Sequence, residues 1–151
     1  MQYQTIDHVL RATWQAVAKM YNEEAAKYGA TMATGLALLS IDAEDGVPST
    51  SLGPRMGMEA TSLSRTLKSM EEKGLVRREP NPEDGRGVLI KLTQEGLEKR
   101  KLSKSLVKKF NLAIEETITE NELKAFHKVA DVIMSKLEDK STFTLKEMSA
   151  S

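Results

Sequence analysis

The side chains best suited to binding a ligand lie on one predicted helix that begins near Glu59. Arg65 and Lys68 occupy the face opposite its apolar stripe, and three short hydroxyl side chains accompany them: Thr61, Ser62 and Ser64. Arginine can pair bidentately with guanine in the major groove of DNA, and serine or threonine can reach bases or phosphates. These residue types on one face favour an exposed surface that contacts a DNA duplex.

An apolar stripe must position this helix. Leu63, Leu67 and Met70 recur at i, i+4 and i+7, which places them on one face of a helix with 3.6 residues per turn. Gly74 stands where a helix C-cap needs a left-handed residue, so the helix is predicted to end there.

Two short strands are predicted after the helix. They cover Leu75–Glu79 and Val88–Leu92, and residues 80–87 form the turn between them. A helix followed by a hairpin is the shape of a winged helix, so we expect a mainly α fold with a small β-hairpin wing. Arg86 in this turn suits a narrow minor groove, whose negative potential attracts a guanidinium. Taken alone, it would equally fit a solvated hairpin.

Four short motifs follow one another in this region. They are Met70-Glu71-Glu72-Lys73-Gly74-Leu75-Val76, Arg77-Arg78, Pro82-Glu83-Asp84-Gly85-Arg86 and Leu92-Thr93-Gln94-Glu95-Gly96. Their order and spacing resemble the MarR family of bacterial winged helix-turn-helix regulators. The resemblance implies that Arg86 enters the minor groove and that Asp84 helps to fix the geometry of the wing.

Two shorter helices are predicted before this region, which completes a helix-turn-helix. The first covers about Thr34–Ile41, and residues 42–48 form a loop. The second begins near Ser49 or Ser51. Pro54 is expected in its first turn, where a missing N–H is tolerated.

Gly57 is predicted to end that helix just before the recognition helix, at whose head Glu59 stands. The resembled family often has a serine or threonine cap at this position. A carboxylate there suits the helix dipole but repels phosphate. It could instead accept a hydrogen bond from a cytosine amino group.

Long amphipathic helices are predicted at both ends of the chain. Gly29 stops the first, Thr93 can cap the second and Thr119 begins a capping box for the last. A small winged domain offers too little surface to cover all three apolar faces, and the resemblance implies that they intertwine with a second copy. The residues expected at this dimer interface are Ile6, Leu10, Val17, Phe110, Leu123, Phe126, Ile133 and Leu137.

The composition argues against several classes of function. The 151 residues include no cysteine, which excludes disulfides, thiolate metal sites and thiol-based redox sensing. The two histidines, His8 and His127, are far apart, so no metal site is expected. No nucleophile–base set or phosphate-cradling loop is present, so we predict neither an enzyme nor a cofactor. No apolar run spans a membrane and no signal pattern opens the chain, so the default location is cytoplasmic.

The charge balance counts mildly against DNA binding. The net charge is zero and the isoelectric point is about 6.8, whereas DNA-binding domains are often basic. Local charge matters more, because exposed charges beyond roughly 8–10 Å are screened at physiological salt. Cations gather in or near the central stretch: Arg55, Arg65, Lys68, Arg77, Arg78, Arg86 and Lys91.

The predicted organisation is a single MarR-like chain over residues 1–137. Residues 34–93 form the winged helix-turn-helix, residues 5–28 and 94–137 form dimerisation helices, and residues 138–151 form a polar tail. The expected function is a sequence-specific regulator of transcription that binds double-stranded DNA as a homodimer on a pseudo-palindromic operator. Repression is favoured over activation.

A small-molecule effector is an expected second partner. Trp14, Tyr21 and Met56 are candidate residues for its site, although core packing is the alternative role of each. The alternative function is a winged-helix module that binds proteins and not DNA. Fold alone does not decide between the two.

Overall fold

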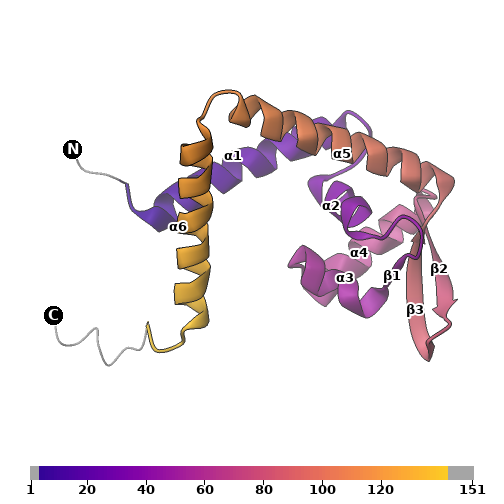
Figure 1. Cartoon of the computed structure of the whole chain (residues 1–151). Helices are drawn as coiled ribbons and strands as arrows, with labels where there is room; N and C mark the ends of the chain where they lie inside the picture. The colour runs from indigo at the N-terminus through magenta and orange to yellow at the C-terminus, as the bar shows by residue number, and fades with distance from the viewer. Residues whose placement is uncertain (1–3, 143–151) are drawn as a thin grey trace. The chain divides into compact units, whose positions relative to one another are not determined.

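Figure 1 shows the computed structural model of the chain, which describes residues 4–142. Two compact units make up the chain, Met1–Leu106 and Val107–Ser151. The elements in order are α1 (Ile6–Ala26), α2 (Met32–Ser40), β1 (Val47–Pro48), α3 (Ser49–Met56), α4 (Ala60–Glu72), β2 (Val76–Asn81), β3 (Asp84–Leu92), α5 (Gln94–Glu115) and α6 (Glu120–Glu138). No helix within residues 4–142 is long and apolar enough to cross a membrane.

The core of the first unit joins its helices to its sheet. The largest fully buried side chains come from different parts of the unit: Ile41, Val47, Leu52, Met70 and Ile90. The predicted apolar stripe of α4 is confirmed, since Leu63, Leu67 and Met70 are its buried residues. Each buried side chain of this size contributes about 1.5–3 kcal/mol relative to exposure. The core therefore holds α4 by one face and leaves the other exposed.

The sheet has three antiparallel strands in the order β1-β3-β2. The predicted hairpin is confirmed, but the prediction that residues 42–48 are entirely loop was wrong. Val47 is buried and pairs with Ile90, and Pro48 pairs with Leu89. A strand of two residues has no readable alternation, and its partner lies about forty positions away in sequence. Only the folded chain brings the two together.

The turn of the wing is shorter than predicted. β2 continues to Asn81 and β3 begins at Asp84, so Pro82 and Glu83 alone connect the strands, where the sequence suggested residues 80–87. Pro80 lies within β2, opposite Val88. β2 is an edge strand, where a proline costs little because one side of the strand has no partner.

α3 departs from expectation at Pro54. The helix begins at Ser49, so Pro54 lies in the second turn and not in the first. β1 ends at Pro48 and thereby sets the start of α3, which the sequence alone did not reveal. Because proline has no N–H, Pro54 leaves the Thr50 carbonyl without its helical hydrogen bond. Thr50 is exposed, so water can bind this carbonyl instead. Gly57 ends the helix, as predicted, and the structure shows it in the left-handed conformation with φ 62°.

The end of α4 and the start of α5 are joined by a set of contacts that we call the clasp: Gly74, Leu75, Thr93 and Gly96. Gly74 has φ 69°, and the Leu75 N–H donates to the Met70 carbonyl at 2.9 Å, which ends α4 in a Schellman turn. The Thr93 N–H donates to the Leu75 carbonyl at 3.0 Å, and the Thr93 hydroxyl donates to the Gly74 carbonyl. The same hydroxyl oxygen accepts from the Gly96 N–H at 3.1 Å, so Thr93 caps α5 as predicted.

The second unit holds the end of α5 and all of α6. Thr119 and Glu122 form the predicted capping box, in which the Thr119 hydroxyl accepts from the Glu122 N–H at 3.2 Å. The Thr119 N–H donates in return to Glu122 Oε2 at 2.7 Å, and this bond, with one from the Thr119 hydroxyl, lowers the pKa of Glu122. α6 ends at Glu138. Of the predicted polar tail, residues 143–151 lie outside the described residues.

The clasp leads to a prediction about Gly96. A Cβ at this position would lie 2.0 Å from the Leu75 carbonyl oxygen, which is backbone and cannot move aside alone. Gly96→Ala should therefore destabilise the protein by about 1–3 kcal/mol or more, measured by thermal or urea unfolding. Gly85→Ala is the matched control, since a Cβ there meets nothing within 4 Å. Equal stability of the two variants would contradict the packing argument.

Candidate nucleic-acid interface

The exposed face of α4, here called the recognition face, carries the polar residues singled out from the sequence. Leu63, Leu67 and Met70 hold the opposite side of the helix in the core. The recognition face consists of Thr61, Ser62, Ser64, Arg65 and Lys68, all of which are exposed. A helix fixed along its whole buried stripe presents these side chains in a constant arrangement.

Two contacts secure the C-terminal end of α4 from outside its own stripe. Arg78 on β2 donates from Nε to Glu71 Oε2 at 3.0 Å. Lys73 donates from Nζ to the Gly29 carbonyl at 2.9 Å, which ties the end of α4 to the loop between α1 and α2. Sequence reasoning missed the Lys73 contact. The only available signal was the lysine that precedes Gly74 in the family motif.

The tip of the wing is shaped by side chains that accept from backbone N–H groups. Asn81 Oδ1 accepts from the Glu83 N–H at 3.0 Å, and Asp84 Oδ1 accepts from the Arg86 N–H at 3.1 Å. Such bonds hold a chain reversal without further partners. The Arg86 side chain is exposed beside them.

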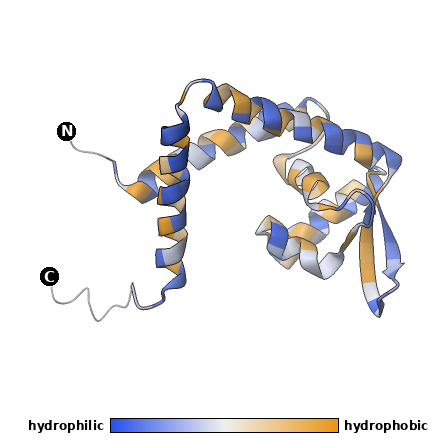
Figure 2. Ribbon diagram, in the orientation of Figure 1, coloured by the Kyte–Doolittle hydropathy of each residue, from blue (hydrophilic) through white to orange (hydrophobic). Residues whose placement is uncertain are grey.

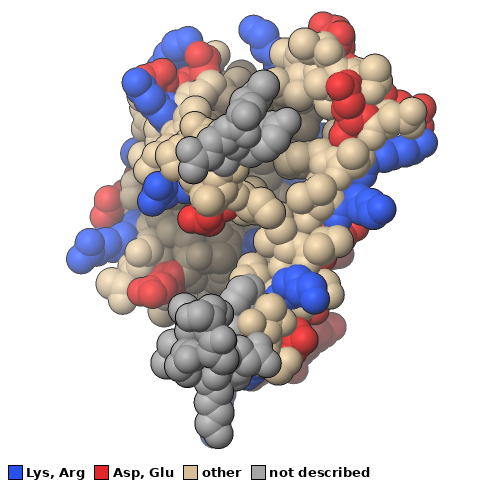
Figure 3. Space-filling view, turned by 90° about the vertical axis from the view of Figure 1, so that its left-hand side faces the viewer, with Lys and Arg blue, Asp and Glu red and all other residues tan. Residues whose placement is uncertain are grey.

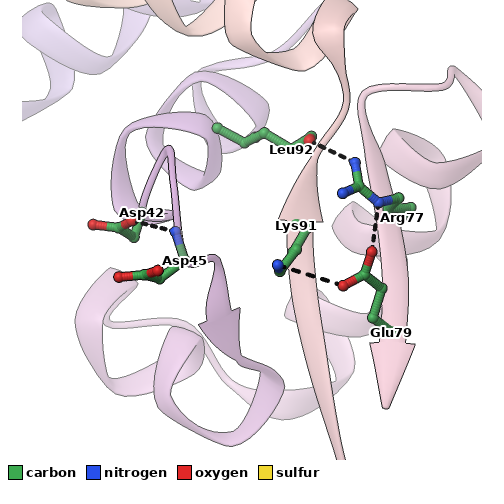
Figure 4. Close-up of polar contacts among 6 residues, drawn as sticks. All are labelled: Asp42, Asp45, Arg77, Glu79, Lys91 and Leu92. Atoms are coloured by element: carbon green, nitrogen blue, oxygen red, sulfur yellow. Dashed lines mark hydrogen bonds and ion pairs between the residues drawn. The ribbon is translucent and has the colours of Figure 1, made fainter. Parts of the chain in front are cut away.

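The two long strands of the wing are linked by the charged network in Figure 4. Arg77 donates from Nε to Glu79 Oε1 at 2.8 Å and from a terminal nitrogen to the Leu92 carbonyl at 3.1 Å. Lys91 lies 3.5 Å from the other carboxylate oxygen of Glu79. The hydrogen bond from Arg77, followed by the charge of Lys91, lowers the pKa of Glu79. These two cations therefore stabilise the sheet.

Figure 4 also shows the turn that precedes β1. Asp42 Oδ1 accepts from the Asp45 N–H at 2.7 Å and from the Glu44 N–H at 2.9 Å. Both bonds favour the ionised carboxylate and lower the pKa of Asp42. The turn delivers Val47 to its place beside Ile90.

The cations of the central stretch fall into two groups. Arg55, Arg77, Arg78 and Lys91 each contact a protein carbonyl or carboxylate. Within residues 4–142, the side chains of Arg65, Lys68 and Arg86 make no ion pair or hydrogen bond with the protein, so their donors remain available. On the face drawn in Figure 3, lysines and arginines alternate with acidic residues, and no large surface of one sign appears.

The residues suggested for an effector site differ in exposure. Trp14 is 58% exposed, and Tyr21 is half-buried, with burial raising its pKa. Met56 is 8% exposed and belongs to the hydrophobic core. Of the residues suggested for a dimer interface, Ile6, Leu10, Phe126 and Leu137 are exposed, and Val17, Phe110, Leu123 and Ile133 are partly buried.

The described residues show no metal centre. Within residues 4–142, no group of three or more histidine, aspartate or glutamate side chains could hold a metal ion.

A helix-turn-helix whose second helix exposes cations and hydroxyls, followed by a β-hairpin, defines a winged helix-turn-helix protein. Residues 30–88 match the model of the MarR family. Over this winged helix-turn-helix region, the chain is thus similar to the MarR family.

Curated relatives are transcriptional regulators. The HTH-type transcriptional regulator SarZ of Staphylococcus haemolyticus is 32% identical over 89 residues, which are 59% of this chain and 60% of the relative. The organic hydroperoxide resistance transcriptional regulator of Bacillus subtilis is 32% identical over 88 residues, 58% of this chain and 60% of the relative. The chain thus spans less than two thirds of the length of these two relatives.

Solved structures match over more of the chain. The S. aureus MepR–DNA complex superposes with a TM-score of 0.79 at 18% identity and covers 89% of this chain and 99% of that one. A variant MarR from E. coli in complex with operator DNA superposes with a TM-score of 0.74 at 25% identity, and the match covers 85% of this chain and 92% of that one. PcaV from Streptomyces coelicolor in complex with its natural ligand superposes with a TM-score of 0.71 at 21% identity, and the match covers 89% of this chain and 98% of that one.

Proposed function

We propose that this protein is a ligand-responsive transcriptional repressor that binds a pseudo-palindromic operator in double-stranded DNA as a homodimer. The observation that carries the proposal is the recognition face of α4, whose Arg65 and Lys68 donors have no partner within residues 4–142, while neighbouring cations do. Arg65, Thr61, Ser62 and Ser64 contact the major groove, Lys68 contacts a phosphate, and Arg86 enters the minor groove. Asp84 holds the wing turn that carries Arg86.

Exposed apolar side chains on the terminal helices support the homodimer. α1 and α6 contain no buried residue, and Figure 2 shows apolar and hydrophilic residues alternating along both. Ile6 is 62%, Phe126 64% and Leu137 61% exposed. A second copy would remove these faces from water, and its two-fold symmetry would place two copies of α4 in successive major grooves.

The proposed binding of a homodimer to a pseudo-palindromic site is tested by letting the purified protein select sequences from random DNA duplexes. Two symmetry-related half-sites should be enriched, with centres one helical turn apart, about 10–10.5 base pairs. Sedimentation at micromolar concentration should show a dimer. A folded monomer that enriches a single, asymmetric half-site would contradict this arrangement.

Alanine variants of α4 should separate base contacts from phosphate contacts. Arg65→Ala should lose about 1–3 kcal/mol of binding free energy on the selected site and should relax discrimination, because a bidentate base contact disappears. Lys68→Ala should weaken binding to all sequences alike and reduce the slope of log affinity against log salt by about one. Binding titrations at several salt concentrations measure both effects.

Lys128→Ala is the matched control for the loss of one positive charge. Lys128 is exposed on α6, outside the winged helix-turn-helix. Its removal should leave the salt slope and the preferred sequence unchanged. Equal losses for Arg65→Ala on the selected site and on random DNA would contradict base contact by Arg65.

A small-molecule effector would act by changing the spacing of the two α4 helices in the dimer. The ligand complex of the structural neighbour PcaV supports such a partner, and Trp14 and Tyr21 on α1 are the candidate contacts. A thermal-shift screen of small aromatic acids should find a compound that raises the melting temperature and lowers operator affinity. A compound that raises the melting temperature without changing operator affinity would contradict regulation through this route.

The alternative function is a winged-helix module that binds a protein and not DNA. It predicts no DNA binding that depends on salt, whereas the proposed function predicts that log affinity falls linearly with log salt. The named activity of the relatives supports the regulator.

A further inference from the structure

The N-cap residue of the recognition helix has a side chain that makes no stabilising bond within residues 4–142. Glu59 is the N-cap of α4, with φ −70° and ψ 153°, yet its carboxylate makes no capping hydrogen bond. The side chain is exposed, and among residues 4–142 it forms no ion pair. By contrast, the N-cap side chains of α2 and α6, Thr31 and Thr119, both accept from a backbone N–H.

The start of α4 is set by other contacts. Met58 and Leu63 flank the first turn at the positions of a hydrophobic staple, and both pack in or against the core. Gly53 on α3 lets the two helices approach closely, since a Cβ there would lie 3.3 Å from the Met58 carbonyl. The Glu59 carboxylate can therefore be changed without loss of the helix.

We infer that Glu59 determines sequence specificity by accepting a hydrogen bond from the amino group of a cytosine in the major groove. The inference rests on the proposed function, because it needs α4 to lie in that groove. The N-terminal residues of a recognition helix are the ones that contact base edges in helix-turn-helix proteins. Among residues 4–142, the cation of Arg65 on the same helix forms no ion pair with Glu59, so the carboxylate is not held by a protein group.

The chemistry of the bases selects cytosine. A carboxylate only accepts hydrogen bonds, and cytosine alone presents an amino donor in the major groove without an acceptor on the same base. Adenine places its N7 acceptor beside its amino group, and guanine and thymine present acceptors. The carboxylate also repels phosphate, so it weakens binding where no cytosine is in reach. This supplies discrimination in a protein whose net charge is zero.

Glu59→Gln tests the inference, because glutamine both donates and accepts and prefers adenine. Sequences are selected from random duplexes with the unaltered full chain and with Glu59→Gln. The unaltered protein should require cytosine at one position of each half-site, by about tenfold over other bases. The variant should change that position to adenine and leave the remaining positions as they were.

Glu72→Gln is the matched control, because Glu72 is exposed at the other end of α4 and its loss changes the charge by the same amount. It should leave the selected sequence unchanged. An identical motif for the unaltered protein and Glu59→Gln, with a uniform gain in affinity, would overturn the inference and leave the proposed function standing. An unaltered protein that enriches no motif would overturn both.

Discussion

The Leu75 carbonyl accepts the Thr93 N–H and lies where any side chain on residue 96 would have to be. This carbonyl is one part of the clasp, which joins the end of α4, the end of β3 and the start of α5. The wing leaves the clasp along β2 and comes back to it along β3, so its base cannot shift without breaking the clasp. Arg65 on α4 and Arg86 on the wing are thereby carried by elements that are joined at the clasp.

The fold also determines which cations bind protein groups and which remain exposed without a partner among the described residues. Arg77 and Lys91 contact the Glu79 carboxylate, and Arg78 contacts the Glu71 carboxylate. Arg65, Lys68 and Arg86, whose side chains have no partner within residues 4–142, lie on the outer face of α4 and at the tip of the wing. A protein of zero net charge can therefore still present exposed cations at two separate places on its surface.

Predictions from local patterns agree with the structure. The stripe of α4, the left-handed glycines 57 and 74, and the Thr119 capping box each depend on residues within about one or two helical turns. The errors concern pairing between distant segments. β1 exists because Val47 meets Ile90, and its end at Pro48 moves Pro54 into the second turn of α3. β2 can continue through Pro80 because it is an edge strand, and its position in the sheet cannot be inferred from the local sequence.

The sequence by itself determined the order of the helices, the polar face of α4 and the resemblance to the MarR family, because helical periodicity, caps and short motifs are local. Only the tertiary structure decided which cations are occupied, how Lys73 reaches the Gly29 carbonyl, and why residue 96 must be glycine. Hydrogen bonds between distant segments depend on where the backbone places each acceptor. The same information separates Glu59, which lacks a capping bond, from the threonines that cap α2 and α6.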